Sequence, residues 1–208
     1  NEEVARHDHA AMNDTFLRTS KLLLFILVPM SLYLFVFATP LVEIFYQNRN
    51  FTAAAIGEAA FFLKLLAVTL FITGINTMVT RVFIAVQAIR QAFIYQVILN
   101  VLLIIVTWLC TKAYGAYGYV YGIIIVNLVN YFGMYFVCKK LAPFIDYAAL
   151  LTYCAFILFF NMLIAGGLLL LARYYDAGNL GNVITGFLAY IVILLLLNRI
   201  FNFNTELD

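Results

Sequence analysis

Long apolar stretches separated by short polar turns recur along the whole of this 208-residue chain. Stretches of about 20 apolar residues are long enough to cross a hydrocarbon core about 30 Å thick as helices. They are too long for the strands of a membrane barrel, which have about 10 residues each. The pattern therefore predicts an all-α, polytopic membrane protein with six transmembrane helices, near residues 21–39, 60–85, 92–111, 117–138, 148–172 and 183–197.

Polarity divides the chain into three predicted parts. Residues 1–20 are polar and compatible with a helix, which predicts a juxtamembrane linker helix at the membrane surface. Residues 21–140 hold four of the predicted transmembrane helices, and residues 141–208 hold the last two. Pro29 lies in the middle of the first transmembrane helix, where the loss of a backbone hydrogen bond predicts a bend. Pro40 begins a short amphipathic segment.

Composition supports a membrane protein and gives no sign of a metal or nucleic-acid site. Apolar residues make up 66% of the chain and charged residues only 11%, against about 25% charged in soluble domains. The few charges lie mostly between the apolar stretches, so the net charge of +2 indicates no nucleic-acid partner. Cys110, Cys138 and Cys154 have no paired spacing and no nearby histidine, so we expect neither a disulfide nor a metal.

The second predicted helix carries the most polar groups. Lys64 and Arg81 lie near opposite ends of this helix, so each side chain can reach the membrane interface at its own end. Alternatively, one or both face a hydrated cavity. This helix also carries a stripe of polar residues at helical spacing. Such a stripe favours a face turned to protein or water over a face turned to lipid. The candidate cavity residues are Lys64, Asn76 and Arg81 of this helix, together with Arg90 in the basic turn that follows. The stripe consists of Thr69, Thr73, Asn76, Thr77 and Thr80.

The fourth predicted helix contains residues suited to helix packing. Gly118 and Gly122 form a small-xxx-small pair that lets another backbone approach closely. Asn127 and Asn130 are interpreted as buried amides that bond between helices; ion or substrate coordination is the alternative.

Basic residues near the helix ends predict the orientation. With Arg81 and Lys64 included, eight lie on the side of the amino-terminal tail and four on the other side. Because cytoplasmic loops carry an excess of Lys and Arg, both termini are predicted to be cytoplasmic. The chain begins at Asn1 without an initiator methionine, so we expect it to be part of a longer protein.

Four segments together resemble the second half of the bacterial peptidoglycan lipid II flippases (MurJ, formerly MviN), in the larger group of multidrug, oligosaccharidyl-lipid and polysaccharide exporters. Within residues 81–92 the family pattern is R-x-F-Y-A-x-x-D-x-x-x-P. Ala88 replaces its acidic residue and Ala92 its proline. The four segments are AAMNDTFLRTSKLLLFILVP (10–29), ATPLVEIFYQNRNFT (38–52), RVFIAVQAIRQA (81–92) and YGAYGYVYG (114–122).

The resemblance implies the last six of fourteen transmembrane helices, with both ends of the segment in the cytoplasm and the first eight helices missing. Such a flippase moves an undecaprenyl-pyrophosphate-linked sugar-peptide across the inner membrane by alternating access, without ATP hydrolysis. The implied partners are this lipid-linked glycan precursor, membrane lipids and the missing amino-terminal helices. The last two helices would form a groove for the lipid tail.

The resemblance also suggests where a coupling cation would bind. Some family members use an asparagine on the third helix, with an acidic residue one turn later. Asn100 matches the asparagine, but Ile104 stands at the acidic position, which argues against cation coupling through this pair. No other cofactor is expected, and the identity of any coupling cation stays open.

Two other functions compete with this one. An exporter of another lipid-linked glycan, such as an O-antigen or capsule repeat unit, would show a similar pattern of turns and glycines. A membrane scaffold without transport activity belongs to a different class. An enzyme is not expected, because no helix offers paired carboxylates or a serine and histidine pair.

Overall fold

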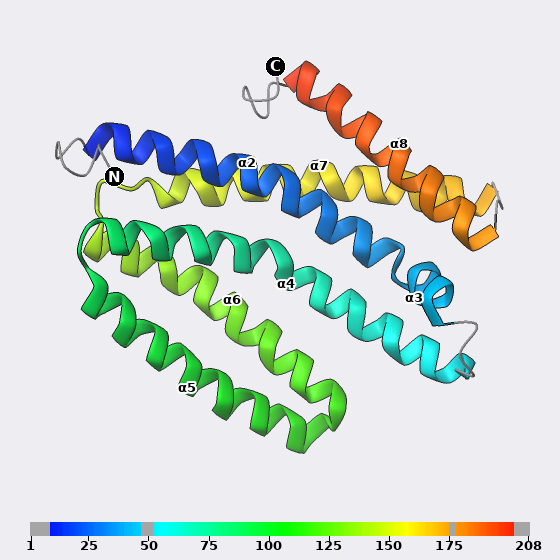
Figure 1. Ribbon diagram of the computed structural model, residues 1–208, viewed down its shortest axis with the longest axis horizontal. Coiled ribbons are helices and arrows are strands. Elements are labelled where there is room, and N and C mark those ends of the chain that lie inside the picture. Colours follow the sequence, from blue (N-terminus) through cyan, green and yellow to red (C-terminus); the bar gives the residue numbers. More distant parts are fainter. Residues whose placement is uncertain (1–8, 47–51, 175–177, 202–208) are drawn as a thin grey trace. The chain divides into compact units, whose positions relative to one another are not determined.

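The computed structural model describes residues 9–46, 52–174 and 178–201 and is all-helical over them (Figure 1). Short turns join long helices, as expected where the backbone must satisfy its own hydrogen bonds inside a bilayer. No strand occurs in these ranges. The helices are α2 (His9–Val36), α3 (Ala38–Tyr46), α4 (Ala53–Ala85), α5 (Ile89–Tyr114), α6 (Ala116–Leu141), α7 (Tyr147–Tyr174) and α8 (Gly178–Phe201).

Among the described residues, five helices are long and apolar enough to cross a membrane: α2, α4, α5, α6 and α7. In α8 the apolar part is shorter and covers Val183–Leu196. These helices confirm the predicted all-α, polytopic membrane fold, with α8 in the place of the sixth predicted span.

Residues 1–8 of the predicted linker helix lie outside the described ranges. From His9 onward the polar segment is continuous with the first span, and α2 also runs through Pro29. The break comes at Phe37, whose N–H still bonds to the Tyr33 carbonyl oxygen at 2.9 Å. Pro40 then lies in the first turn of α3, where a backbone N–H would have no partner within the helix.

The chain forms two compact units, which we describe separately. Unit 1 comprises Asn1–Leu24 and Thr69–Ala155; unit 2 comprises Phe25–Val68 and Phe156–Asp208. The helices α2, α4 and α7 therefore each contribute to both. The predicted functional division near residues 20 and 140 stays a prediction.

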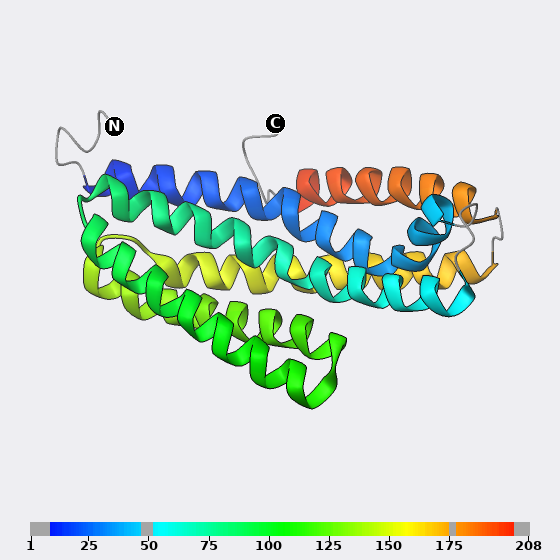
Figure 2. The ribbon, with the colours of Figure 1, turned by 60° about the horizontal axis from the view of Figure 1, so that its bottom comes forward.

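In unit 1, α5 and α6 form an antiparallel hairpin (Figures 1 and 2). The turn is at Gly115, whose φ of 63° suits a residue without a side chain. At the opposite end of the hairpin, the Tyr95 hydroxyl donates to Asn130 Oδ1 at 2.8 Å. This bond fixes the start of α5 beside the second half of α6.

The same end of unit 1 holds the beginning of α2 and the α6–α7 turn. Asn13 Oδ1 accepts a hydrogen bond from the Asp146 N–H at 2.8 Å, and the His9 ring stacks on Phe144 with centroids 4.4 Å apart. Asp146 Oδ1 in turn accepts the Ala149 N–H at 2.9 Å. The carboxylate therefore caps the start of α7.

Unit 2 contains buried polar groups that have partners. The Tyr190 hydroxyl donates to Asn161 Oδ1 at 2.6 Å, and Asn161 Nδ2 donates to the Ile157 carbonyl at 2.8 Å. Both side chains are buried, so these bonds offset the cost of removing them from water. The Tyr33 hydroxyl also bonds to the Val183 carbonyl at 2.7 Å, which ties α2 to α8.

Candidate functional site

The polar stripe predicted for the second span lies on α4, and its exposed members, Thr73 and Thr77, share one helix face with Arg81. Thr73, Thr77 and Arg81 are exposed, whereas Ile75 and Val79 are buried. We call Thr73, Thr77 and Arg81 the α4 face. Their spacing of four residues places them on successive helical turns, so this face presents two hydroxyl groups followed by a guanidinium group.

The hydroxyl groups of the stripe donate to their own helix. Thr73 Oγ1 donates to the Thr69 carbonyl at 3.0 Å, and Thr77 Oγ1 donates to the Thr73 carbonyl at 3.0 Å. Thr80 Oγ1 donates to the Asn76 carbonyl at 2.9 Å. Each hydroxyl hydrogen is thus in use, while the oxygen lone pairs can still accept a hydrogen bond.

Asn76 lies beside the α4 face and contains an acceptor that is buried without a partner. Its side chain is half-buried, and Oδ1 makes no hydrogen bond in the described part of the chain. Such an orphan acceptor costs about 1–3 kcal/mol when nothing compensates it. A group with an N–H or O–H that reached this oxygen would be stabilised.

The four candidate cavity residues are divided between the two units. Arg81 and Asn76 lie on the part of α4 in unit 1, and Arg90 is exposed in the first turn of α5 in the same unit. Lys64 is half-buried on the part of α4 in unit 2. Of these four residues, only Asn76 belongs to the polar stripe, and Arg81 lies on the α4 face. The roles of all four residues stay predictions.

Sequence reasoning did not identify Gln87, which lies in the turn between α4 and α5. Its φ is 59°, the only positive value for a non-glycine residue in the described ranges. The Gln87 N–H bonds to the Ile84 carbonyl at 3.1 Å, and the Ala88 N–H bonds to the Phe83 carbonyl at 2.9 Å. This pair of bonds is the Schellman motif that ends a helix, in which the position of Gln87 is usually glycine.

Asn100 lies on α5, away from any acidic side chain on its own helix face. It is exposed, its Oδ1 accepts a hydrogen bond from Gln96 Nε2 at 3.3 Å, and exposed Ile104 follows one turn later. Over the described ranges, no three His, Cys, Asp or Glu side chains gather as metal ligands would. A cation site at Asn100 stays a prediction.

Gly118 and Gly122 lie where α6 approaches α5 most closely. A Cβ at Gly118 would overlap the Cys110 carbonyl oxygen, and one at Gly122 would lie 2.7 Å from the Thr107 Cα. Asn127 Nδ2 donates to the Ile123 carbonyl at 2.9 Å, within its own helix. The hydrogen bond between helices is made instead by Asn130, which accepts from the Tyr95 hydroxyl on α5. A tyrosine within an apolar stretch does not by itself indicate a polar contact, so Tyr95 could not be identified from the sequence.

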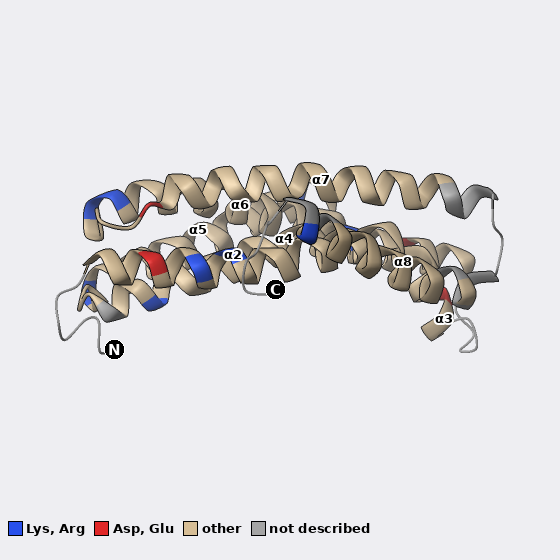
Figure 3. Ribbon diagram, turned by 90° about the horizontal axis from the view of Figure 1, so that it is seen from above, with Lys and Arg blue, Asp and Glu red and all other residues tan. Residues whose placement is uncertain are grey.

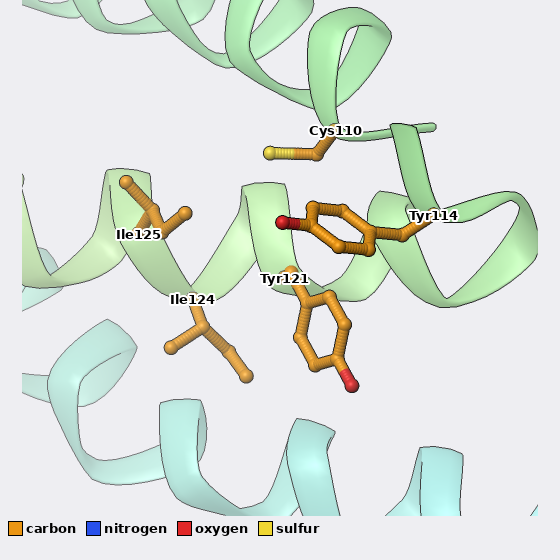
Figure 4. Close-up of a pocket in the computed structure, with 5 residues that line it drawn as sticks. All are labelled: Cys110, Tyr114, Tyr121, Ile124 and Ile125. Atoms are coloured by element: carbon orange, nitrogen blue, oxygen red, sulfur yellow. The ribbon is translucent and has the colours of Figure 1, made fainter. Parts of the chain in front are cut away.

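An open pocket of about 420 Å³ lies beside the Gly115 turn (Figure 4). Its rings, Tyr114 from α5 and Tyr121 from α6, meet edge to face with centroids 5.9 Å apart. Cys110, Ile124 and Ile125 complete the lining, which holds no charged group. The pocket suits an apolar chain and offers nothing to neutralise a phosphate.

Positive charge gathers at one end of unit 1 (Figure 3). Six of the seven Lys and Arg residues in the described part of this unit lie at or toward the end with the α6–α7 turn and the start of α2. Lys112, beside the Gly115 turn, is the seventh, and its Nζ lies 4.5 Å from the centroid of the Trp108 ring. The six are Arg18, Lys21, Arg81, Arg90, Lys139 and Lys140.

The apolar helices and the polar face on one of them define a polytopic helical membrane protein with a polar, cationic strip inside a spanning segment. The family model of the lipid II flippase MurJ matches residues 2–195, and the chain belongs to this family. No curated protein matches the chain. The family and the helices together make it a multi-pass protein of the inner membrane, in a family of flippases and not of enzymes.

Proposed function

We propose that this protein moves lipid II, the undecaprenyl-pyrophosphate-linked peptidoglycan precursor, across the cytoplasmic membrane by alternating access. The observation that carries the proposal is the match of the MurJ lipid II flippase family over residues 2–195. The α4 face supports it, because exposed polar groups within an apolar helix suit a polar cargo.

The physical demand on a flippase is to shelter a polar headgroup from hydrocarbon. An ionised group at the bilayer centre costs at least about 2.5–3.5 kcal/mol, so a pyrophosphate needs cationic and hydrated lining. The α4 face offers this lining through the Arg81 guanidinium and the Thr73 and Thr77 hydroxyls. We assign Arg81 to the pyrophosphate because guanidinium groups bind phosphate oxygens with paired hydrogen bonds.

The lipid tail needs a different surface, and we assign it to α7 and α8 in unit 2. From Phe156 onward, the described part of α7 carries no Lys, Arg, Asp or Glu before Arg173, and α8 carries none before Arg199. Large apolar side chains are exposed along both helices, which suits contact with an isoprenoid chain. They include Phe156, Phe159, Met162, Leu163, Leu170, Ile184, Leu188, Val192 and Leu195.

We further propose that both termini of the segment are cytoplasmic. The gathering of six cations at or toward one end of unit 1, against Lys112 at the other, supports this orientation. The α6–α7 turn would then lie in the cytoplasm and the Gly115 turn on the outer side.

Depletion of the protein in its own host tests the proposed function. Intact cells are treated with an externally added enzyme that cleaves exposed lipid II, and the uncleaved fraction is measured. The proposal predicts that uncleaved lipid II accumulates and that the cells lyse. Normal exposure of lipid II together with loss of a surface glycan would overturn it and assign the protein to the polysaccharide exporters.

A further inference from the structure

We propose that the α4 face binds the headgroup in one direction, with phosphate at Arg81 and hydroxyl or amide N–H groups of the sugar-peptide at Thr77 and Thr73. This inference rests on the proposed function and adds the chemistry and order of the contacts along the helix.

The order follows from helix geometry. With a rise of 1.5 Å per residue, Thr73 lies about 12 Å from Arg81 along the axis, and Thr77 lies midway. Arg81 is the member of the face closest to the α4–α5 turn, since α4 ends at Ala85. A ligand along the face therefore meets a cation near the turn and hydroxyl groups farther into the helix.

The two ends of the face differ in hydrogen-bonding character. Guanidinium groups only donate, and phosphate oxygens only accept, so these two are complementary. At Thr73 and Thr77 the hydroxyl hydrogens are already bonded to the carbonyls of Thr69 and Thr73 at 3.0 Å. These threonines present acceptor lone pairs, which pair with sugar hydroxyls and amide N–H groups but not with phosphate.

The two kinds of ligand differ in the donors that they offer to the threonine end of the face. A sugar-peptide headgroup carries many O–H and N–H groups, whereas a bare polyprenyl pyrophosphate offers almost none. The face should therefore distinguish these two ligands at its threonine end and bind both at its arginine end.

Two ligands separate the two ends in a binding experiment. The purified protein in nanodiscs is titrated with lipid II and with undecaprenyl pyrophosphate, which lacks the sugar-peptide. Thr73→Val combined with Thr77→Val should weaken binding of lipid II by about threefold to tenfold per lost hydrogen bond. Binding of undecaprenyl pyrophosphate should stay unchanged, whereas Arg81→Gln should weaken binding of both ligands to a similar extent.

Thr152→Val is the matched control. Thr152 is also an exposed threonine of unit 1, and it donates to the carbonyl four residues earlier, Ala148, at 3.0 Å. This variant should bind both ligands like the wild type. Thr73→Ser combined with Thr77→Ser restores both oxygens and should restore the affinity for lipid II, which separates the hydroxyl effect from a folding defect.

Equal weakening of both ligands by the valine pair, or no weakening of either, would overturn the inference. A loss that appears only in the presence of Na⁺ would also overturn it, because the oxygens would then serve a cation. Failure of the proposed function looks different, since the wild-type protein would then bind lipid II no better than an unrelated phospholipid.

Discussion

At the scale of single residues, hydrogen bonds decide what each polar side chain offers. The polar stripe of α4 was predictable because threonine and asparagine recur there at helical spacing in an apolar stretch. The hydrogen-bond partner of each threonine hydroxyl could not be predicted, because the sequence does not show whether a threonine bonds to its own helix or to a neighbour. Gln87 was also missed, because a positive φ is usually signalled by glycine or asparagine and neither is present in this turn.

Gln87 gives a prediction about stability. Gln87→Gly should raise the free energy of unfolding in detergent by about 0.5–1 kcal/mol, because glycine occupies a left-handed conformation without strain from a Cβ. Ala88→Gly is the control: Ala88 has a φ of −83°, so glycine there only adds freedom to the unfolded chain. Ala88→Gly should therefore lower the free energy of unfolding. A destabilising Gln87→Gly would contradict the strain that we assign to this turn.

At the scale of the helices, the length and apolar character of each stretch were enough to predict the membrane-spanning helices. They were not enough to predict where each helix ends or which helices pack together. Residues 9–20 and the first span form one continuous helix, because a polar segment with good helix formers can continue a helix out of the bilayer. The α5–α6 pair was suggested by Gly118 and Gly122, since small residues permit close approach. The Tyr95–Asn130 and Tyr190–Asn161 bonds could not be predicted, because the residues of each pair lie far apart in the sequence.

The close approach of α5 and α6 predicts an intolerance to larger side chains. Gly122→Ala should lower the free energy of unfolding by about 1–3 kcal/mol, because the new methyl group would force the Thr107 backbone away. Gly166→Ala on α7 adds the same methyl group where no atom lies within 4 Å of the new Cβ. That control should be neutral or slightly stabilising, and equal losses in both variants would contradict tight packing at Gly122.

A buried hydrogen bond joins α7 to α8 and can be tested in the same way. Tyr190→Phe removes the hydroxyl that donates to Asn161 Oδ1 at 2.6 Å and leaves this oxygen buried without that donor. The free energy of unfolding should fall by about 1–3 kcal/mol. Tyr190→Phe combined with Asn161→Leu removes both polar groups and should recover part of the loss. An additive loss in the double variant would indicate that the two side chains stabilise the protein independently.

At the scale of the whole molecule, the sequence was sufficient to predict the membrane class, the family and an expected orientation. It did not give the division into two compact units, because helix association within a bilayer depends on local fit and not on an apolar stripe. The proposed orientation rests on charge, and unit 1 shows how six cations that are scattered along the sequence come to lie at or toward one end.

Cysteine labelling tests this orientation. In a Cys110→Ser background, Lys112→Cys should react with a membrane-impermeant maleimide in intact cells. Lys140→Cys should react only after the membrane is permeabilised, because the α6–α7 turn is expected in the cytoplasm. Cys138 and Cys154 are buried and should contribute little background. The reverse labelling pattern would invert the proposed topology.

The central claim is that this flippase carries lipid II and uses the polar face of α4 to do so. The most direct measurement is the fraction of lipid II exposed to an external cleaving enzyme in cells whose only copy of the protein carries Arg81→Gln. Lys112→Gln, at the other end of unit 1, is the control. Our account predicts that Arg81→Gln lowers the rate of exposure about tenfold, which corresponds to about 1.4 kcal/mol, while Lys112→Gln has the wild-type rate. A wild-type rate for Arg81→Gln, at equal protein levels in the membrane, would contradict it.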